Sequence, residues 1–173
     1  TTVSSKSQGS IMKYLSHSKL ALLALTLASS FATSGALADY RLTAFSDTAG
    51  FQALVKEDLA KAKSIFASRS LKNMDYFETN NLCVAQILFE EYDAAIASCS
   101  SAIAKSKFSS ELTFGNEKVA LASIYSNLAV AKVLAGDGAG ANVDLEMALW
   151  LNQQNSKASI NYDLISTNLI TAR

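Results

Sequence analysis

Residues 81–103 read NLCVAQILFEEYDAAIASCSSAI, and residues 127–149 read NLAVAKVLAGDGAGANVDLEMAL. The two stretches align without a gap over their whole length. The matching pairs are Asn81/Asn127, Leu82/Leu128, Val84/Val130, Ala85/Ala131, Leu88/Leu134, Ala95/Ala141 and Ala102/Ala148. A third partial copy begins at Asn161, and a degenerate copy ends near Phe66. Such self-similarity indicates a repeat architecture, in which each unit buries its apolar face against its neighbours.

Apolar residues recur at spacings of three and four along most of the chain, which is typical of one buried helical face. Between residues 51 and 66 they lie on one such face. Similar faces recur around 76–88, 93–104, 118–135, 141–151 and 158–169. The stretches between them, such as FEEYD and AGDGAG, are rich in turn-forming or charged residues. The pattern therefore predicts an all-α protein of six helices, paired in antiparallel hairpins.

The repeat resembles the tetratricopeptide repeat (TPR) family over nearly all of the chain after residue 38. In that family a small residue follows a leucine in the first helix, and alanines flank a large residue in the second. These positions, predicted to pack between helices, are Leu82, Cys83, Ala95, Cys99 and Ala102 in one unit, and Leu128, Ala129, Ala141, Leu145 and Ala148 in the next. Small residues let the two backbones approach, and the large residue fills the space between neighbouring repeats.

The resemblance implies a short right-handed solenoid of stacked helical hairpins, built from residues 39–173. Two clear repeats are expected at about 76–106 and 122–153. A degenerate first unit is expected at about 48–68, and a capping helix at about 156–171.

The first 38 residues read as sequence outside this domain. Residues 12–38 run from a start methionine through two lysines and an apolar run to small residues, the order typical of a secretory signal peptide with cleavage after Ala38. The alternative, a transmembrane anchor, needs about 20 apolar residues, and the run is shorter. Residues 1–11 are taken as upstream sequence. We therefore expect a periplasmic or secreted domain, with no stable membrane insertion after cleavage.

Composition argues against several functions. After residue 38, twelve basic residues stand against fifteen acidic ones, a net charge of −3, which argues against nucleic acid as a partner. The only histidine, His17, lies in the predicted signal peptide, so the domain has none for acid–base catalysis or zinc. The glycines at 136–140 lack the lysine of a phosphate-binding loop and are read as a helix cap and turn. We expect no enzyme activity, no cofactor and no metal.

Asparagines recur at one place in three successive first helices, at Asn81, Asn127 and Asn161. First helices line the concave, ligand-binding face in the TPR family, and an amide offers a peptide backbone both donors and an acceptor. The resemblance thus implies a protein- or peptide-binding face, to which Lys157 adds a charge for a carboxylate. Its other expected members are Phe77, Asn80, Val84, Ile87, Ser123, Ser126, Val130 and Val133. Alternatively, each asparagine satisfies backbone groups of the neighbouring helix.

The two cysteines, Cys83 and Cys99, are too far apart in sequence for a redox or zinc motif of the C-x-x-C type. Their midpoint, Glu91, lies in the predicted turn, so they sit level across an antiparallel hairpin. Facing Cα atoms of packed helices lie roughly 3.5–5.5 Å apart, which overlaps the disulfide range of about 4.4–6.8 Å. Export would favour a disulfide worth about 3 kcal/mol, and two buried free thiols are the alternative.

Taken together, the sequence predicts a non-enzymatic module that binds a protein or peptide or serves as a scaffold. Two alternatives stay open. The chain could be a structural subunit that associates with itself and hides apolar faces by stacking. It could also be a thiol-active redox protein that uses Cys83 and Cys99.

Overall fold

The computed structural model describes residues 39–106 and 114–171. All described residues lie within one compact unit, residues 34–173. The predicted signal peptide, its cleavage point and residues 1–11 therefore lie outside the described residues.

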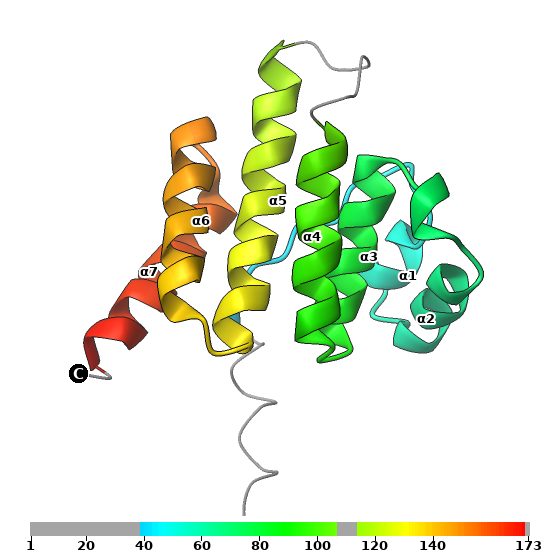
Figure 1. Ribbon diagram of the computed structural model, residues 1–173, viewed down its shortest axis with the longest axis horizontal. Coiled ribbons are helices and arrows are strands. Elements are labelled where there is room, and N and C mark those ends of the chain that lie inside the picture. The colour runs from blue at the N-terminus through cyan, green and yellow to red at the C-terminus, as the bar shows by residue number, and fades with distance from the viewer. Residues whose placement is uncertain (1–38, 107–113, 172–173) are drawn as a thin grey trace, which may run out of the picture. The chain divides into compact units, whose positions relative to one another are not determined.

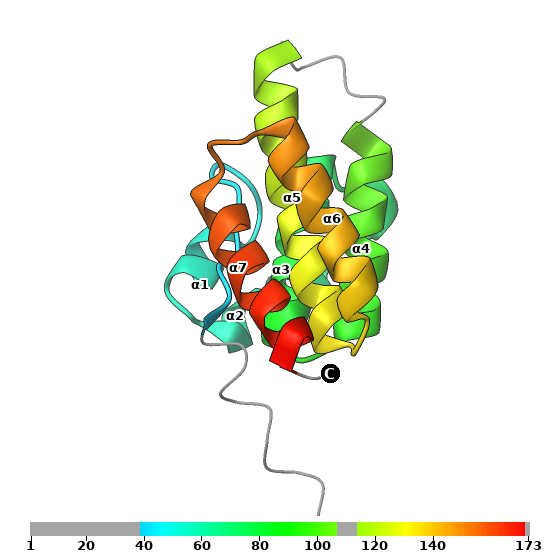
Figure 2. The same ribbon diagram turned by 90° about the vertical axis from the view of Figure 1, so that its left-hand side faces the viewer.

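The described residues form helices and connecting segments, without strands. The elements are α1 (Phe51–Val55), α2 (Leu59–Ala67), the 3-10 helix η2 (Leu71–Asn73), α3 (Tyr76–Leu88), α4 (Tyr92–Ser106), α5 (Phe114–Leu134), α6 (Gly138–Leu151) and α7 (Ser156–Thr171). From α3 to α7, each helix packs against the next, as a stack of hairpins requires (Figure 1 and Figure 2). The predicted all-α fold class is confirmed.

The apolar face between residues 51 and 66 is divided between two helices, and the prediction of a single helix there is wrong. The helix α1 ends at Val55 with Lys56 as its C-cap, and Glu57 has a left-handed φ of 56°. Asp58 then starts α2 by accepting a hydrogen bond from the Lys61 amide at 3.0 Å. The described residues consequently contain seven α-helices instead of the predicted six. Neither glycine nor proline marks the break, and the apolar spacing continues across it. The sequence pattern therefore predicts one helix.

The core follows the stack as three successive clusters. The first joins α1 and α2 to α3, the second surrounds Cys83, Cys99 and Ile124, and the third surrounds Leu145 and Ile165. Of the positions predicted to pack between helices, Leu82 is half-buried and all the others are buried. Small residues thus lie where helices cross, as close approach of two backbones requires.

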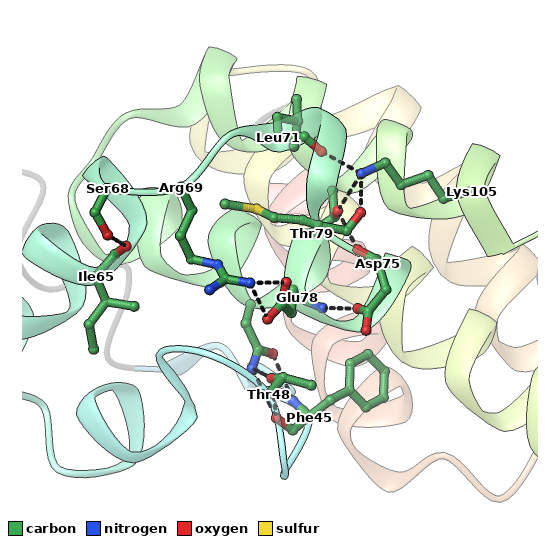
Figure 3. A network of polar contacts seen from close by, with 12 residues as sticks. Phe45, Thr48, Ile65, Ser68, Arg69, Leu71, Asp75, Glu78, Thr79 and Lys105 are labelled. Atoms are coloured by element: carbon green, nitrogen blue, oxygen red, sulfur yellow. Dashed lines mark hydrogen bonds and ion pairs between the residues drawn. The ribbon is translucent and has the colours of Figure 1, made fainter.

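A polar network holds the start of α3 in place (Figure 3). Arg69 donates to both carboxylate oxygens of Glu78, at 2.7 Å each. Asp75 caps α3 by accepting from the Glu78 amide at 2.7 Å, and Lys105 on α4 donates to the Leu71 carbonyl at 2.6 Å. Charge-assisted contacts of this kind are the stronger hydrogen bonds, so they fix the position of α3 and of the polar face it carries.

Within residues 39–106 and 114–171, no helix combines the length and the apolar character needed to cross a membrane.

Candidate functional site

Residues 40–45, which we call the strap, run across the first helices α3, α5 and α7. Figure 1 shows this part of the chain as the cyan trace that passes behind α5 and α4. Every second strap residue is bonded to one asparagine. Arg41 is bonded to Asn161, Thr43 to Asn127 and Phe45 to Asn81. We call these three asparagines the ladder.

Each rung of the ladder uses both ends of the side-chain amide. Asn161 Oδ1 accepts from the Arg41 N–H at 2.8 Å, and its Nδ2 donates to the Arg41 carbonyl at 2.9 Å. Asn127 does the same with Thr43 at 2.9 and 2.8 Å, and Asn81 with Phe45 at 2.8 and 2.9 Å. A repeat of two residues is the period of an extended chain. The ladder therefore grips an extended backbone and reads no side chain.

Further hydrogen bonds connect the rungs. Asn127 Nδ2 also donates to Asn80 Oδ1 at 2.8 Å, and Asn161 Nδ2 donates to Ser126 Oγ at 3.0 Å. Asn80 in turn donates to the Thr43 carbonyl at 2.9 Å. A buried amide without partners costs about 1–3 kcal/mol. Because these asparagines are fully buried, the network must be kept complete for the fold to be stable.

Both ends of the strap are anchored. Near α3, the Phe45 ring meets the Phe77 ring edge-on, with centroids 4.8 Å apart. Thr48 Oγ1 donates to the Phe45 carbonyl at 3.0 Å (Figure 3). Near α7, Lys157 Nζ donates to the Leu42 carbonyl at 2.8 Å. Partial shielding from solvent lowers the pKa of Lys157. The lysine expected to meet a carboxylate thus meets a backbone carbonyl of the strap.

The structure brings the predicted binding face together and covers it. Its buried members are Asn80, Asn81, Val84, Ile87, Ser123, Ser126, Asn127, Val130 and Asn161, while Phe77 and Val133 are half-buried and Lys157 is exposed. The ladder amides bond backbone groups, but those of the strap and not those of a neighbouring helix. The occupant of the face is therefore the chain itself.

The sequence reasoning missed the strap. Its residues read YRLTAF, in which apolar and polar side chains alternate at the start as they do along an extended strand. That alternation was the available signal for an extended segment, and it is only a few residues long.

The cysteine pair lies at disulfide distance between α3 and α4. The structure joins Cys83 to Cys99 with their Cα atoms 5.3 Å apart, inside the range expected for facing positions of packed helices. Both side chains are fully buried. In the part of the chain that the structure describes, no group of three or more His, Cys, Asp or Glu side chains could hold a metal ion.

A pocket of about 690 Å³ opens beside the strap. Its apolar lining includes Leu42 and Ala44 of the strap, Leu54 and Val55 of α1, and Val84 and Leu88 of α3. A cavity of this size accommodates a small molecule or a few side chains of a partner.

No protein-family model matches the chain, and no curated protein matches it. Among solved structures, the chain is similar to the second TPR domain of human RPAP3, determined by NMR in complex with the HSP70 peptide SGPTIEEVD. The TM-score is 0.54 at 17% sequence identity, and the match covers 68% of this chain and 88% of that domain. The likeness shows the fold, an all-α solenoid of the TPR type.

Proposed function

We propose that this chain is a non-enzymatic protein- or peptide-binding module whose concave face holds an extended segment, the chain's own strap, and binds an extended peptide there. The observation that carries the proposal is the ladder, which grips every second residue of an extended segment by its backbone alone. Any extended segment presents the same groups at the same spacing. The human neighbour, a domain of the same fold, holds a peptide, which supports this mode of binding.

The lack of catalysis is part of this proposal. The chain after residue 38 contains no histidine, and both cysteines are buried in the core. A thiolate nucleophile needs exposure and a positive neighbour, and neither cysteine is exposed. We therefore expect the native protein to show no reactive thiol until it is both unfolded and reduced.

We also propose that the protein acts in the periplasm or outside the cell, after cleavage behind Ala38. The order of residues in 12–38 supports this location, and so does a cysteine pair at disulfide distance, since disulfides persist in oxidising compartments. N-terminal sequencing of the exported protein should begin at Asp39. A protein that keeps residues 12–38 would contradict the proposal.

The binding test needs variants that leave the core intact. Val130 is fully buried, so a charge there would unfold the protein. Val55 lines the pocket and is 61% exposed, whereas Val143 on α6 is 62% exposed and does not line it. In cross-linking capture from an envelope extract, we expect Val55→Glu to lose partners and Val143→Glu to retain them. Equal capture by both variants and by the unmodified protein would contradict the assignment of partner binding to the pocket beside the strap.

Self-association is a second candidate, favoured by one exposed apolar stripe. Val143, Met147 and Trp150 lie at helical spacing on α6 and are all exposed. A second copy could bury this stripe by packing α6 against α6. Light scattering should then show a dimer that Val143→Glu dissociates and Val55→Glu leaves intact. A monomer at all concentrations would exclude this candidate.

A further inference from the structure

The strap contacts the ladder through only one of its two edges. Residues 41, 43 and 45 direct their N–H and C=O groups to the ladder, so residues 42 and 44 direct theirs to the opposite edge. There, the Leu42 carbonyl accepts from Lys157. Within the described residues, the Leu42 N–H and both backbone groups of Ala44 bond no protein group. Apart from the Leu42 carbonyl, the outer edge of the strap is therefore an unpaired edge of extended backbone, which can template a strand.

The apolar pocket lies next to the same strap residues. Its lining includes Tyr40, Leu42 and Ala44, whereas Arg41, Thr43 and Phe45 do not line it. The pocket thus adjoins the alternate set of strap residues whose backbone is turned away from the ladder. A strand that paired with this edge would have aliphatic side chains of α1 and α3 within reach.

We propose that an extended peptide of a partner protein pairs with the outer edge of the strap as an added strand and inserts aliphatic side chains into the pocket. The inference rests on the proposed function and makes it more specific, because the partner adds to the strap and does not replace it. Main-chain hydrogen bonds supply affinity in this mode, and the pocket selects the side chains at alternate positions.

Addition is favoured over displacement by the tether between the strap and the rest of the domain. Residues 46–50 connect the strap directly to α1, so its effective concentration at the ladder is on the order of millimolar. A free peptide would have to outcompete a complete set of buried hydrogen bonds. At the outer edge, the one hydrogen bond that the described residues make to Leu42 or Ala44 comes from the Lys157 ammonium, whose side chain is exposed.

Two proline variants of the full chain separate the two edges. Ala44→Pro removes an N–H from the outer edge and keeps every ladder bond, since proline and the residue before it both suit an extended backbone. Thr43→Pro removes the N–H that Asn127 accepts, and so loosens the strap. Ala44→Ser keeps the outer N–H and is the matched control.

The probes are fluorescein-labelled, end-capped hexapeptides in which leucine or valine alternates with threonine or lysine, read by fluorescence anisotropy. For the tightest peptide, we expect Ala44→Pro to weaken binding about tenfold, Ala44→Ser to bind normally, and Thr43→Pro to bind more weakly. N-methylation of alternate peptide amides should weaken binding to the same degree.

The opposite pattern would overturn the inference. If Thr43→Pro tightens binding while Ala44→Pro leaves it unchanged, the peptide replaces the strap, and the proposed function survives without the added strand. If no peptide of the panel binds the unmodified protein, both the inference and peptide binding by the concave face are wrong.

Discussion

The hairpins α3–α4 and α5–α6 occupy equivalent places in the repeat but are closed by different chemistry. The structure places Cys83 and Cys99 of the first hairpin at disulfide distance. In the ungapped alignment their equivalents in the second hairpin are Ala129 and Leu145, both fully buried. The space between the two helices is thus filled by the sulfur atoms of two cysteines in the first hairpin. In the second hairpin it is filled by the side chains of an alanine and a leucine. The cysteines occupy packing positions, and the disulfide adds covalent closure.

The outer surfaces of the two hairpins differ as well. The exposed stripe of Val143, Met147 and Trp150 on α6 aligns with Ala97, Ser101 and Ala104 on α4. The ladder asparagines, in contrast, are the same in α3, α5 and α7. The ladder asparagine is therefore common to α3, α5 and α7, whereas the apolar outer stripe belongs to α6.

The largest loss of unfolding free energy is expected at Leu145, because the second hairpin is held at this position by packing alone. Leu145→Ala removes a fully buried side chain and leaves a cavity, which should lower the free energy of unfolding by about 2–5 kcal/mol. Denaturant unfolding measures this change. Val143→Ala, on the exposed side of the same helix, should change it by no more than about 0.5 kcal/mol. Similar values for the two variants would show that α6 is not packed as described.

The residues Ala129 and Leu145 of the second hairpin can be introduced at the equivalent cysteine positions of the first. Cys83→Ala with Cys99→Leu keeps a packed pair but opens the covalent loop, so the oxidised protein should lose about 3 kcal/mol of unfolding free energy. A reductant should destabilise the unmodified protein by a similar amount and leave the variant unchanged. A variant as stable as the oxidised protein would mean that closure contributes nothing beyond packing.

The ladder is expected to contribute less per residue. Asn127→Ala leaves the Thr43 N–H and Asn80 Oδ1 without the partner that Asn127 supplies, which should cost about 1–3 kcal/mol in denaturant unfolding. The control is Asn142→Ala on α6, where the hydrogen bond from the amide to Glu146 is exposed. Its effect should be close to zero. Equal losses of unfolding free energy in the two variants would show that the ladder does not stabilise the fold.

The smallest effect concerns an ion pair found only in the second hairpin. Lys132 Nζ lies 2.6 Å from Asp144 Oδ2, and the equivalent residues in the first hairpin are Gln86 and Ser98. Burial raises the pKa of Asp144, and the hydrogen bond and charge of Lys132 lower it in part. Lys132→Gln removes this relief and should destabilise the protein by about 1 kcal/mol at neutral pH.

The pH dependence of that variant follows from the sign of the shift. Without Lys132, the pKa of Asp144 in the folded state rises further above its unfolded value. The folded state then binds a proton more readily than the unfolded state, so the loss should shrink as the pH falls through the folded-state pKa. Lys132→Gln with Asp144→Ser, which copies the first hairpin, should recover stability at neutral pH. A loss independent of pH would contradict this explanation.

The sequence predicted what depends on local pattern. Helical periodicity and small residues at crossings are local properties, and they located the two central hairpins. The break at residues 56–58 was missed because a capping aspartate, Asp58, redirects the chain without interrupting the apolar spacing. The recurrence of asparagine predicted amides suited to a backbone. The segment that these amides bind could not be predicted, because every extended segment offers the same backbone groups, including the chain's own residues 40–45.

Residue-resolved amide hydrogen exchange on the full chain tests the central claim, that the ladder grips alternate residues of an extended segment, most directly. The N–H groups of Arg41, Thr43 and Phe45 should be protected, while those of Leu42 and Ala44 should exchange nearly as fast as in an unfolded chain. In Asn127→Ala, protection at Thr43 should fall most. Equal exchange at all five positions would contradict the account.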